Sequence, residues 1–270
     1  MHKLKNLLFQ IYAVLFARRG FEAFNQLIVD FGYRGLGIMN WQSFSLSGEL
    51  FLSEYLKKNY DLDIVFDIGA NKGRYAETYT DKAKKIFCFE PVPSTFQELR
   101  SNLSGRKGVI LFPKGLSNKT GECPIYDYED SDGSSHASLY KEVITDIHNS
   151  NSRKIDIELT TLDEVVEEYD ISRINLLKID TEGNELKVLA GGKKTLSANK
   201  IDIIQIEFNE MNVVSRTFMR DFVQLLSSYN MYRLLPKSFL PIKYQRPVKH
   251  EIFAFQNIIA IRKEIDKTEF

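Results

Sequence analysis

The sequence predicts a doubly wound α/β fold with a mostly parallel sheet. From residue 62 onward, short runs rich in β-branched and aromatic residues alternate with segments of helical apolar spacing. These runs are apolar on both faces, which is typical of strands covered by helices on both sides. Two further apolar runs near the C-terminus have no helix between them, so they predict a C-terminal antiparallel strand that ends the sheet.

The expected elements follow in chain order. Strands are predicted over 64–68, 86–89, 109–112, 174–179 and 201–208, and an antiparallel pair over 232–235 and 252–261. Helices are predicted over 74–82, 94–103, 161–169, 184–197 and 215–229. We therefore expect one domain over 61–265, with a polar, β-rich insertion at about 121–160, and an N-terminal helical extension over 1–60.

The start of the extension is apolar but short. Residues 4–17 have helical apolar spacing, yet they fall below the ~20 residues that span a bilayer. Arg18 and Arg19 stand where a signal peptide would have small residues. We expect a helix that docks on its own domain or on a second subunit of a homo-oligomer. The alternative is a peripheral membrane helix, since the first 21 residues hold four Lys/Arg and no acid.

Composition excludes some classes of protein. The 36 Lys+Arg balance the 36 Asp+Glu, which argues against a nucleic-acid partner because non-specific binding needs a basic excess. An apolar content of 43% provides for a large core and excludes general disorder. Two cysteines, Cys88 and Cys123, are too few for a disulfide scaffold. We expect a cytoplasmic protein, peripheral to the inner face of the membrane in the alternative case.

A glycine turn follows the first strand in VFDIGANKG, residues 65–73. It keeps Gly69 and Gly73 of the dinucleotide fingerprint but has Asn71 where the middle glycine would be, which disfavours close approach of a pyrophosphate. Asp67 would repel a diphosphate and attract an ammonium group. Glu90 ends the second strand, where an acid can accept both ribose hydroxyls. A nucleoside with a cationic, phosphate-free tail fits both acids, and S-adenosylmethionine is such a ligand.

Over about residues 60–262 the sequence resembles the FkbM-type family of S-adenosylmethionine-dependent methyltransferases. The shared stretches are VFDIGANKG, FCFEP, KGLSNKTGE, TTLDEV and LLKIDTEGNE, of which the last is the most specific. The resemblance implies a Rossmann-like class I methyltransferase fold, with S-adenosylhomocysteine as a product. It also implies methyl transfer to a hydroxyl oxygen, commonly on a sugar of a glycan or a glycosylated natural product.

The resemblance also implies roles for individual residues. The methionine part of the cofactor would be held by Asp67, Gly69, Ala70, Asn71 and Gly73. The ribose would be held by Glu90, the adenine would lie between Leu116 and Ser117, and Asp180 would face the sulfonium and the acceptor.

Acids at strand ends are the candidates for catalysis. A sugar hydroxyl is a poor nucleophile, so a general base should contribute about 10²–10⁴-fold. Asp180 and Glu182 stand two residues apart at a strand end, so both carboxylates can face one crevice, and His136 in the insertion is a possible assistant. Glu207 ends the fifth strand at the same edge and is a candidate for binding the acceptor.

Further acceptor contacts are expected in two loops. Ser135 and His136 lie in GSSHASL, whose hydroxyls can bond a polyol. Residues 222–250 contain five Lys/Arg, no acid and several aromatics, among them Tyr244. We read this stretch either as a solvated loop or as a lobe that binds an acceptor, where aromatics stack on sugars and cations meet an anionic or lipid-linked glycan.

Several alternatives stay open. The acids Asp180, Glu182 and Glu207 could bind Mg²⁺ or Ca²⁺, but they equally suit ammonium and ribose recognition, so no metal is expected. An enzymatic alternative methylates a nitrogen or a carboxylate. The strand–turn–helix unit could also belong to a nicotinamide-dependent oxidoreductase or to a non-catalytic nucleoside-binding scaffold.

Overall fold

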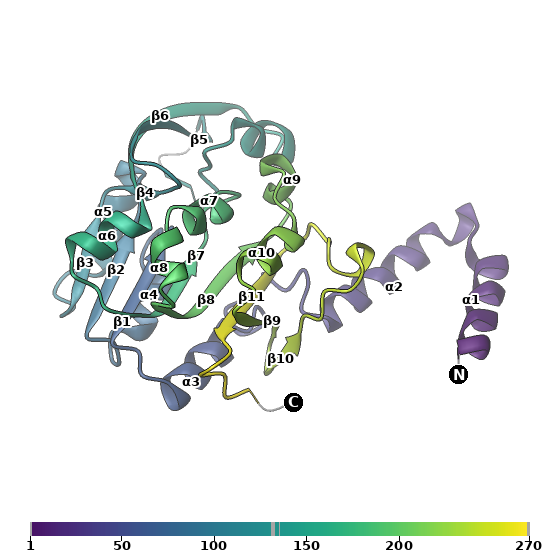
Figure 1. Ribbon diagram of the computed structural model, residues 1–270. Helices are drawn as coiled ribbons and strands as arrows, with labels where there is room; N and C mark the ends of the chain where they lie inside the picture. Colours follow the sequence, from purple (N-terminus) through teal and green to yellow (C-terminus); the bar gives the residue numbers. More distant parts are fainter. Residues whose placement is uncertain (1, 131–132, 135, 269–270) are drawn as a thin grey trace.

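A computed structural model of the chain, describing residues 2–130, 133–134 and 136–268, contains an eight-stranded sheet with helices on both faces (Figure 1). The strand order is β10-β9-β11-β8-β7-β1-β2-β3. Five neighbouring strands are parallel, and the remaining three are antiparallel. The predicted doubly wound α/β fold, mostly parallel and with an antiparallel C-terminal part, is confirmed.

The five parallel strands lie where the sequence predicts them. They are β1 (Ile64–Ile68), β2 (Lys85–Phe89), β3 (Val109–Phe112), β7 (Ile174–Ile179) and β8 (Ile201–Phe208). They pair in regular register; Val65 on β1, for example, lies opposite Ile86 on β2 and opposite Leu176 on β7. Their carboxyl ends therefore meet at one edge of the sheet.

The predicted antiparallel pairing of 232–235 with 252–261 is confirmed, since Tyr232 lies opposite Ile259, but this pair does not end the sheet as expected. Strand β11 (Gln256–Arg262) inserts between β8 and β9 (Tyr229–Leu235), and β10 (Ser238–Pro241) forms the edge beyond β9. The hairpin that ends the sheet is thus β9–β10, which the sequence reading missed. The predicted second strand also begins at Gln256 instead of residue 252.

The helices between residues 74 and 102 and those between residues 162 and 197 cover opposite faces of the sheet. In chain order, the helices that follow β1 are α4 (Arg74–Tyr79), α5 (Pro93–Asn102), α6 (Leu162–Glu168), α7 (Glu185–Ala190), α8 (Lys193–Ser197), α9 (Met211–Ser215) and α10 (Met219–Leu225). Two of them differ from the predicted limits. The helix expected over 184–197 breaks at Gly191–Gly192, because the Gly191 backbone packs against the carbonyl of Ser117. The one expected over 215–229 is shorter than predicted: α10 covers Met219–Leu225, and Arg216, whose φ is 55°, separates it from Ser215 at the end of α9.

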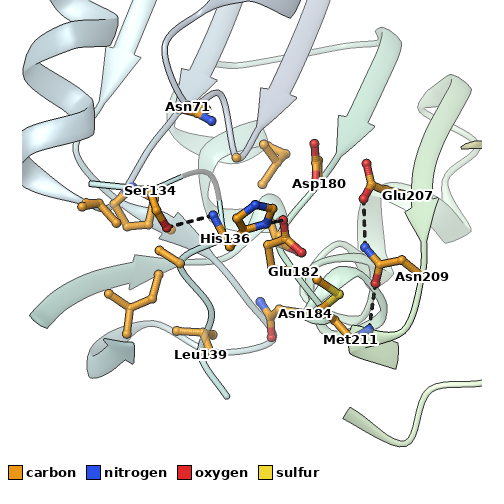
Figure 2. Close-up of a pocket in the computed structure, with 18 of the residues that line it drawn as sticks. Asn71, Ser134, His136, Leu139, Asp180, Glu182, Asn184, Glu207, Asn209 and Met211 are labelled. Atoms are coloured by element: carbon orange, nitrogen blue, oxygen red, sulfur yellow. Dashed lines mark hydrogen bonds and ion pairs between the residues drawn. The ribbon is translucent and has the colours of Figure 1, made fainter. Parts of the chain in front are cut away.

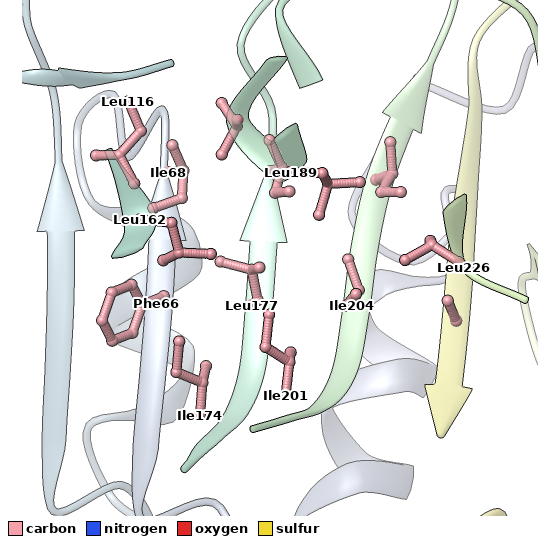
Figure 3. Close-up of a cluster of buried hydrophobic side chains, with 14 of the residues drawn as sticks. Phe66, Ile68, Leu116, Leu162, Ile174, Leu177, Leu189, Ile201, Ile204 and Leu226 are labelled. Atoms are coloured by element: carbon pink, nitrogen blue, oxygen red, sulfur yellow. The ribbon is translucent and has the colours of Figure 1, made fainter. Parts of the chain in front are cut away.

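Two hydrophobic clusters fill the two faces. Phe66, Leu177 and Ile204 point to the face covered by α6, α7 and α10 (Figure 3). Their neighbours along the strands, such as Val65 and Leu176, point to the opposite face. Burial on both sides explains the near-continuous apolar runs of these strands.

Residues 121–160 form a separate small sheet at the carboxyl edge of the large one (Figure 1). Strand β5 (Gly121–Tyr128) pairs antiparallel with β6 (Ser152–Thr160), which also pairs parallel with β4 (Gly115–Leu116). A single π-helical turn, η2 (Val143–Ile147), lies between β5 and β6.

The N-terminal region has two different parts. Helices α1 (His2–Phe16) and α2 (Glu22–Gly35), joined by the short η1 turn (Arg19–Phe21), extend away from the sheet (Figure 1). None of their residues with a described burial is buried, so the expectation that the first helix docks on its own domain is wrong. By contrast, α3 (Glu49–Asn59) buries Leu52 and Leu56 in the cluster around Val65. The domain boundary near residue 60 stays a prediction.

Among residues 2–130, 133–134 and 136–268, no helix combines the length and the apolar character needed to cross a membrane.

Candidate functional site

A cavity of about 480 Å³ opens at the carboxyl ends of β1, β2, β7 and β8 (Figure 2). This is the edge where doubly wound sheets place their ligands. The small sheet covers the cavity with Ile125, Ile157 and Leu159, and the segment between α2 and α3 adds Met39 and Trp41.

The glycine turn after β1 forms one wall. Gly69 has a φ of 76°, and a methyl group there would collide with the carbonyl oxygen of Asp180, so only glycine fits. The amides of Gly69 and Ala70 donate to the Phe89 carbonyl at 3.0 and 2.9 Å. Asn71 adopts the left-handed region with a φ of 47°; asparagine tolerates this conformation better than most residues, so the tight turn forms without the middle glycine.

Not every residue of the turn reaches the cavity. Gly69 and Asn71 line it, whereas Ala70 is buried behind them. Gly73 is the N-cap of α4 and packs on Leu99 and Leu103.

Glu90 fastens this turn to the end of β2. Its Oε2 accepts a hydrogen bond from the Asn71 amide at 3.0 Å, and its Oε1 accepts one from the Val92 amide at 2.9 Å. Burial raises the pKa of Glu90 to about 7, although the two amides oppose the shift. Glu90 lines the cavity, as expected for a residue facing a ribose.

The wall next to the small sheet is held by an amide side chain. Leu116 lines the cavity, and its carbonyl accepts a hydrogen bond from Asn184 Nδ2 at 2.9 Å. Ser117 is buried and does not line the cavity; its hydroxyl lies 3.5 Å from Asn184 Oδ1.

A buried lysine lies beneath the site. Lys178 on β7 places its Nζ 3.0 Å from Asp180 Oδ2 and 3.6 Å from Asp67 Oδ1. Burial opposes its charge, but Asp180 and Asp67 together raise the pKa of Lys178. Asp67 is fully buried and does not line the cavity, and burial raises its pKa to about 6. Asp180 lines the cavity with its carboxylate fixed by the lysine.

Glu182 adopts a restricted backbone conformation at the cavity wall. Its φ is 51°, and its carbonyl accepts a hydrogen bond from Ser138 Oγ at 2.7 Å. Its carboxylate lies 3.6 Å from His136 Nδ1. Burial, and then the charge of Asp180, raise the pKa of Glu182 well above its ordinary value.

Two histidines stand next to each other over Glu182. The ring centroids of His136 and His148 are 4.6 Å apart, and both rings line the cavity. Burial and the neighbouring His136 lower the pKa of His148. The His136 loop is anchored because the Ser134 amide and hydroxyl both donate to the buried Asp127. Ser135, a predicted acceptor contact, lies outside the described residues.

Glu207 faces the same cavity from the end of β8 (Figure 2). Asn209 Nδ2 donates to Glu207 Oε1 at 2.8 Å, while Asn209 Oδ1 accepts from the Met211 amide at 3.0 Å. Burial, followed by the charges of Asp180 and Glu182, raises the pKa of Glu207.

Tyr244 does not line the cavity. Its hydroxyl donates to Glu251 Oε1 at 2.6 Å, and its ring packs against His250 at 5.2 Å. The structure therefore gives no contact between Tyr244 and the cavity that holds the other predicted residues.

The cavity is acidic. Its carboxylates come from Glu90, Asp180, Glu182, Glu207 and Glu210, and within the described chain no Lys or Arg is among its lining residues. Among the described residues, no three His, Cys, Asp or Glu side chains are arranged to hold a metal ion. Carboxylates in a cavity wall suit a cationic ligand and hydroxyl donors.

Several residues of the site escaped the sequence reading. Lys178 lies inside an apolar strand, and nothing in LLKID marks it as the partner of Asp67. His148 was not among the expected site residues, and Asn184 was included only as part of the LLKIDTEGNE stretch. The sole local signal for Asn184 was its place in DTEGNE, directly after the acids.

The chain is similar in sequence to known methyltransferases. Residues 67–233 match the family described as the methyltransferase FkbM domain. The chain is 28% identical to the hexuronic acid methyltransferase AglP of Haloferax volcanii over 62% of this chain and 65% of that protein. It is 27% identical to the 2-O-methyltransferase NoeI of Sinorhizobium fredii over 64% of this chain and 75% of that protein. The match thus spans just under two thirds of the length of AglP.

Solved structures include similar chains at low identity. A crystal structure of methyltransferase FkbM from Methylobacillus flagellatus aligns with 74% of this chain and 44% of its own, at 13% identity and a TM-score of 0.45.

Proposed function

The chain belongs to the FkbM methyltransferase family, and on that premise we propose that it transfers a methyl group from S-adenosylmethionine to a hydroxyl of a sugar-containing acceptor. Family membership confirms the resemblance seen in the sequence and the expectation of a methyltransferase domain that uses this cofactor. The acceptor, the base and the roles of individual residues are proposals.

The observation that carries the proposal is the acidic cavity at the carboxyl edge of the sheet. S-adenosylmethionine supplies a methyl group on a cationic sulfonium when bound. The residues present fit such a ligand, because Gly69 leaves room beside Asp180 and the lining carboxylates favour positive charge. Glu90 would hold the ribose, Gly69 and Asn71 the methionine part, and Leu116 one face of the adenine.

Asp180 and Glu182 have different tasks in this proposal. Lys178 Nζ lies 3.0 Å from Asp180 Oδ2 and orients this carboxylate, which suits it to the recognition of a cation. Glu182 has a raised pKa and a nearby imidazole, so it is the stronger proton acceptor once ionised. We assign it as the general base: it would take the hydroxyl proton as the acceptor oxygen bonds to the methyl carbon and the methyl–sulfur bond breaks, with S-adenosylhomocysteine as the leaving group. His136 stabilises the carboxylate.

The acceptor is best matched by a neutral sugar ring. AglP is named as a hexuronic acid methyltransferase and NoeI as a 2-O-methyltransferase. In this chain the lining residues offer carboxylates and aromatic surfaces, among them Trp41 and His148, without a Lys or Arg among the described ones. Such a lining suits hydroxyl groups and a ring face, so negative groups of the acceptor would remain outside the cavity.

Calorimetric titration of the full chain with S-adenosylhomocysteine tests the cofactor. We expect binding to this compound and none to NAD; the reverse result would indicate an oxidoreductase.

Mass spectrometry of glycans from cells with and without the gene tests the acceptor, and a shift of one methyl group is expected. Unchanged glycans beside a methylated amine or carboxylate metabolite would overturn the sugar assignment.

A further inference from the structure

The N-terminal arm, which we define as residues 2–36, exposes an unusual amount of apolar surface. Leu4, Phe9, Val14 and Phe31 are each more than 60% exposed. Further exposed apolar side chains of the arm are Leu7, Leu8, Ile11, Leu15, Phe24, Leu27, Ile28 and Val29. A contiguous apolar surface of this kind marks a site that is covered by a partner or a membrane.

The arm has its own internal bracing. Tyr12 donates a hydrogen bond to Asn25 Oδ1 at 2.6 Å, and Asn25 Nδ2 donates to the Phe16 carbonyl at 2.9 Å. The Phe16 ring lies 4.9 Å from Tyr12 and 5.1 Å from Phe21. These contacts fix α1 against the start of α2 while leaving the remaining apolar side chains of both helices uncovered.

Charge indicates what covers the arm. Lys3, Lys5, Arg18 and Arg19 accompany the apolar residues, and no acid occurs before Glu22. Lys3, Asn6 and Gln10 recur at three- and four-residue spacing, so they share one side of α1. Anionic lipid headgroups attract such cations, whereas the same arm of a second copy would repel them.

The length of α1 limits how it can meet a bilayer. With 15 residues it measures roughly 22 Å, which is short of the ~30 Å hydrocarbon core. A helix of this length that is apolar and basic lies along the interface instead of spanning it.

The segment that directly follows the arm lines the cavity. Met39 and Trp41, shortly after the end of α2, line the cavity. Arg34 Nη1 donates to the Met39 carbonyl at 3.0 Å, and the Arg34 guanidinium lies 5.7 Å from the Trp41 ring. The Met39 amide donates to the Phe255 carbonyl at 2.8 Å, which joins the arm to the segment that follows the basic loop 243–249. That loop is exposed at Lys243, Arg246 and Lys249, and Val248 is 82% exposed.

We propose that the N-terminal arm docks on an anionic lipid bilayer and holds the mouth of the cavity at the membrane surface. The acceptor is then a glycan presented from the membrane, with its sugar in the cavity and its anionic lipid linkage outside, near the basic loop. This second statement rests on the proposed function; the docking itself does not.

Vesicle flotation of the full chain tests the docking. Vesicles of phosphatidylcholine with phosphatidylglycerol should carry the protein, and pure phosphatidylcholine should carry about tenfold less. The double variant Phe9→Glu/Val14→Glu should lose binding, because it places carboxylates on two of the three most exposed apolar positions of α1. Val213→Glu is the matched control: Val213 is 53% exposed but lies on α9, so flotation should be unchanged.

The charge contribution has its own variant and its own outcome. Replacing Lys3, Lys5, Arg18 and Arg19 by Gln should lower the bound fraction about tenfold and remove the dependence on salt. The proposal would be overturned if the protein bound both vesicle types equally well. It would also be overturned if the Phe9→Glu/Val14→Glu variant bound the anionic vesicles as well as wild type does.

A second measurement tests whether a second copy of the chain, instead of a bilayer, covers the arm. If sedimentation without lipid shows a dimer that Phe9→Glu/Val14→Glu dissociates, a second copy covers the arm and the proposal is wrong. Titration with S-adenosylhomocysteine should be unaffected by the arm variants. Loss of vesicle binding with cofactor binding intact therefore bears on the arm alone, and failure of the cofactor titration bears on the proposed function.

Discussion

The ammonium of Lys178 lies 3.0 Å from the carboxylate of Asp180, and both belong to the chain segment that ends β7. The same ammonium is 3.6 Å from Asp67 at the end of the neighbouring strand β1. One buried cation thus compensates two carboxylates beneath the candidate site. Removing one partner of a buried group of charges leaves the others uncompensated.

We therefore predict that Lys178→Met lowers the free energy of unfolding by about 3–5 kcal/mol at pH 7. Urea denaturation measures the change. The control is Lys84→Met, which removes an exposed lysine 2.6 Å from Asp63 and should change stability little. Equal losses in the two variants would contradict the role assigned to Lys178.

The base assignment makes a prediction about pH. Because burial and Asp180 raise the pKa of Glu182, its carboxyl holds a proton to higher pH than an ordinary glutamate. Protonated Glu182 cannot take the proton of the sugar hydroxyl. The value of kcat/KM should therefore rise with pH, and the midpoint of this rise should lie above 4.5, the ordinary pKa of a glutamate.

Glu182→Gln should remove that rise with pH and lower kcat by about 10²–10⁴-fold. The pH profile of methyl transfer at saturating cofactor measures both effects. His136→Gln is the comparison, since it removes the imidazole 3.6 Å away and keeps the carboxylate. If the rise disappears in His136→Gln and persists in Glu182→Gln, the histidine is the base.

The parallel half of the fold could be predicted from sequence because its strands are buried on both faces. The limits of β1, β3, β7 and β8 follow from apolar runs that are bounded by polar residues, glycine or proline. The place of β11 between β8 and β9 could not be predicted in this way. Pairing of strands distant in sequence depends on the whole sheet, and the apolar run of β11 is compatible with either neighbour.

The candidate site shows a similar division. Asp180, Glu182, Glu207 and Glu90 could be placed at one edge because strand ends of a parallel sheet converge there. Lys178 could not be predicted as a site residue, because its role depends on contacts with Asp67 after folding brings β1 beside β7, as well as with Asp180. Tyr244 looked like a sugar contact by composition, but its hydroxyl bonds Glu251 away from the cavity.

Glu90 makes a prediction about stability. Its pKa is about 7 in the folded protein against an ordinary value of 4.5, so folding favours its protonated form. The sign follows: its contribution to stability is full below pH 4.5 and is lost as pH rises through about 7. The loss amounts to about 3 kcal/mol across this interval.

Glu90→Gln should remove this part of the pH dependence, so the difference in unfolding free energy between variant and wild type should change between pH 4.5 and 8. Urea denaturation at several pH values provides the measurement. Glu54→Gln alters an exposed glutamate on α3 and should leave the slope as it is. A constant difference between Glu90→Gln and wild type at all pH values would show that Glu90 does not titrate as stated.

Gly69 allows a test of the cavity wall with a closely matched control. Gly69 and Gly105 have φ values of 76° and 74°, so alanine at either position meets a similar backbone penalty of about 1–2 kcal/mol. Nothing lies within 4 Å of an added methyl at Gly105, whereas at Gly69 it would collide with the Asp180 carbonyl. Only Gly69→Ala must therefore push β1 and β7 apart at the cofactor wall. We expect Gly69→Ala to weaken binding of S-adenosylhomocysteine by at least about tenfold, or 1.4 kcal/mol, and Gly105→Ala to retain it, as measured by calorimetry. Equal affinities in the two variants would show that the wall around Gly69 does not contact the cofactor.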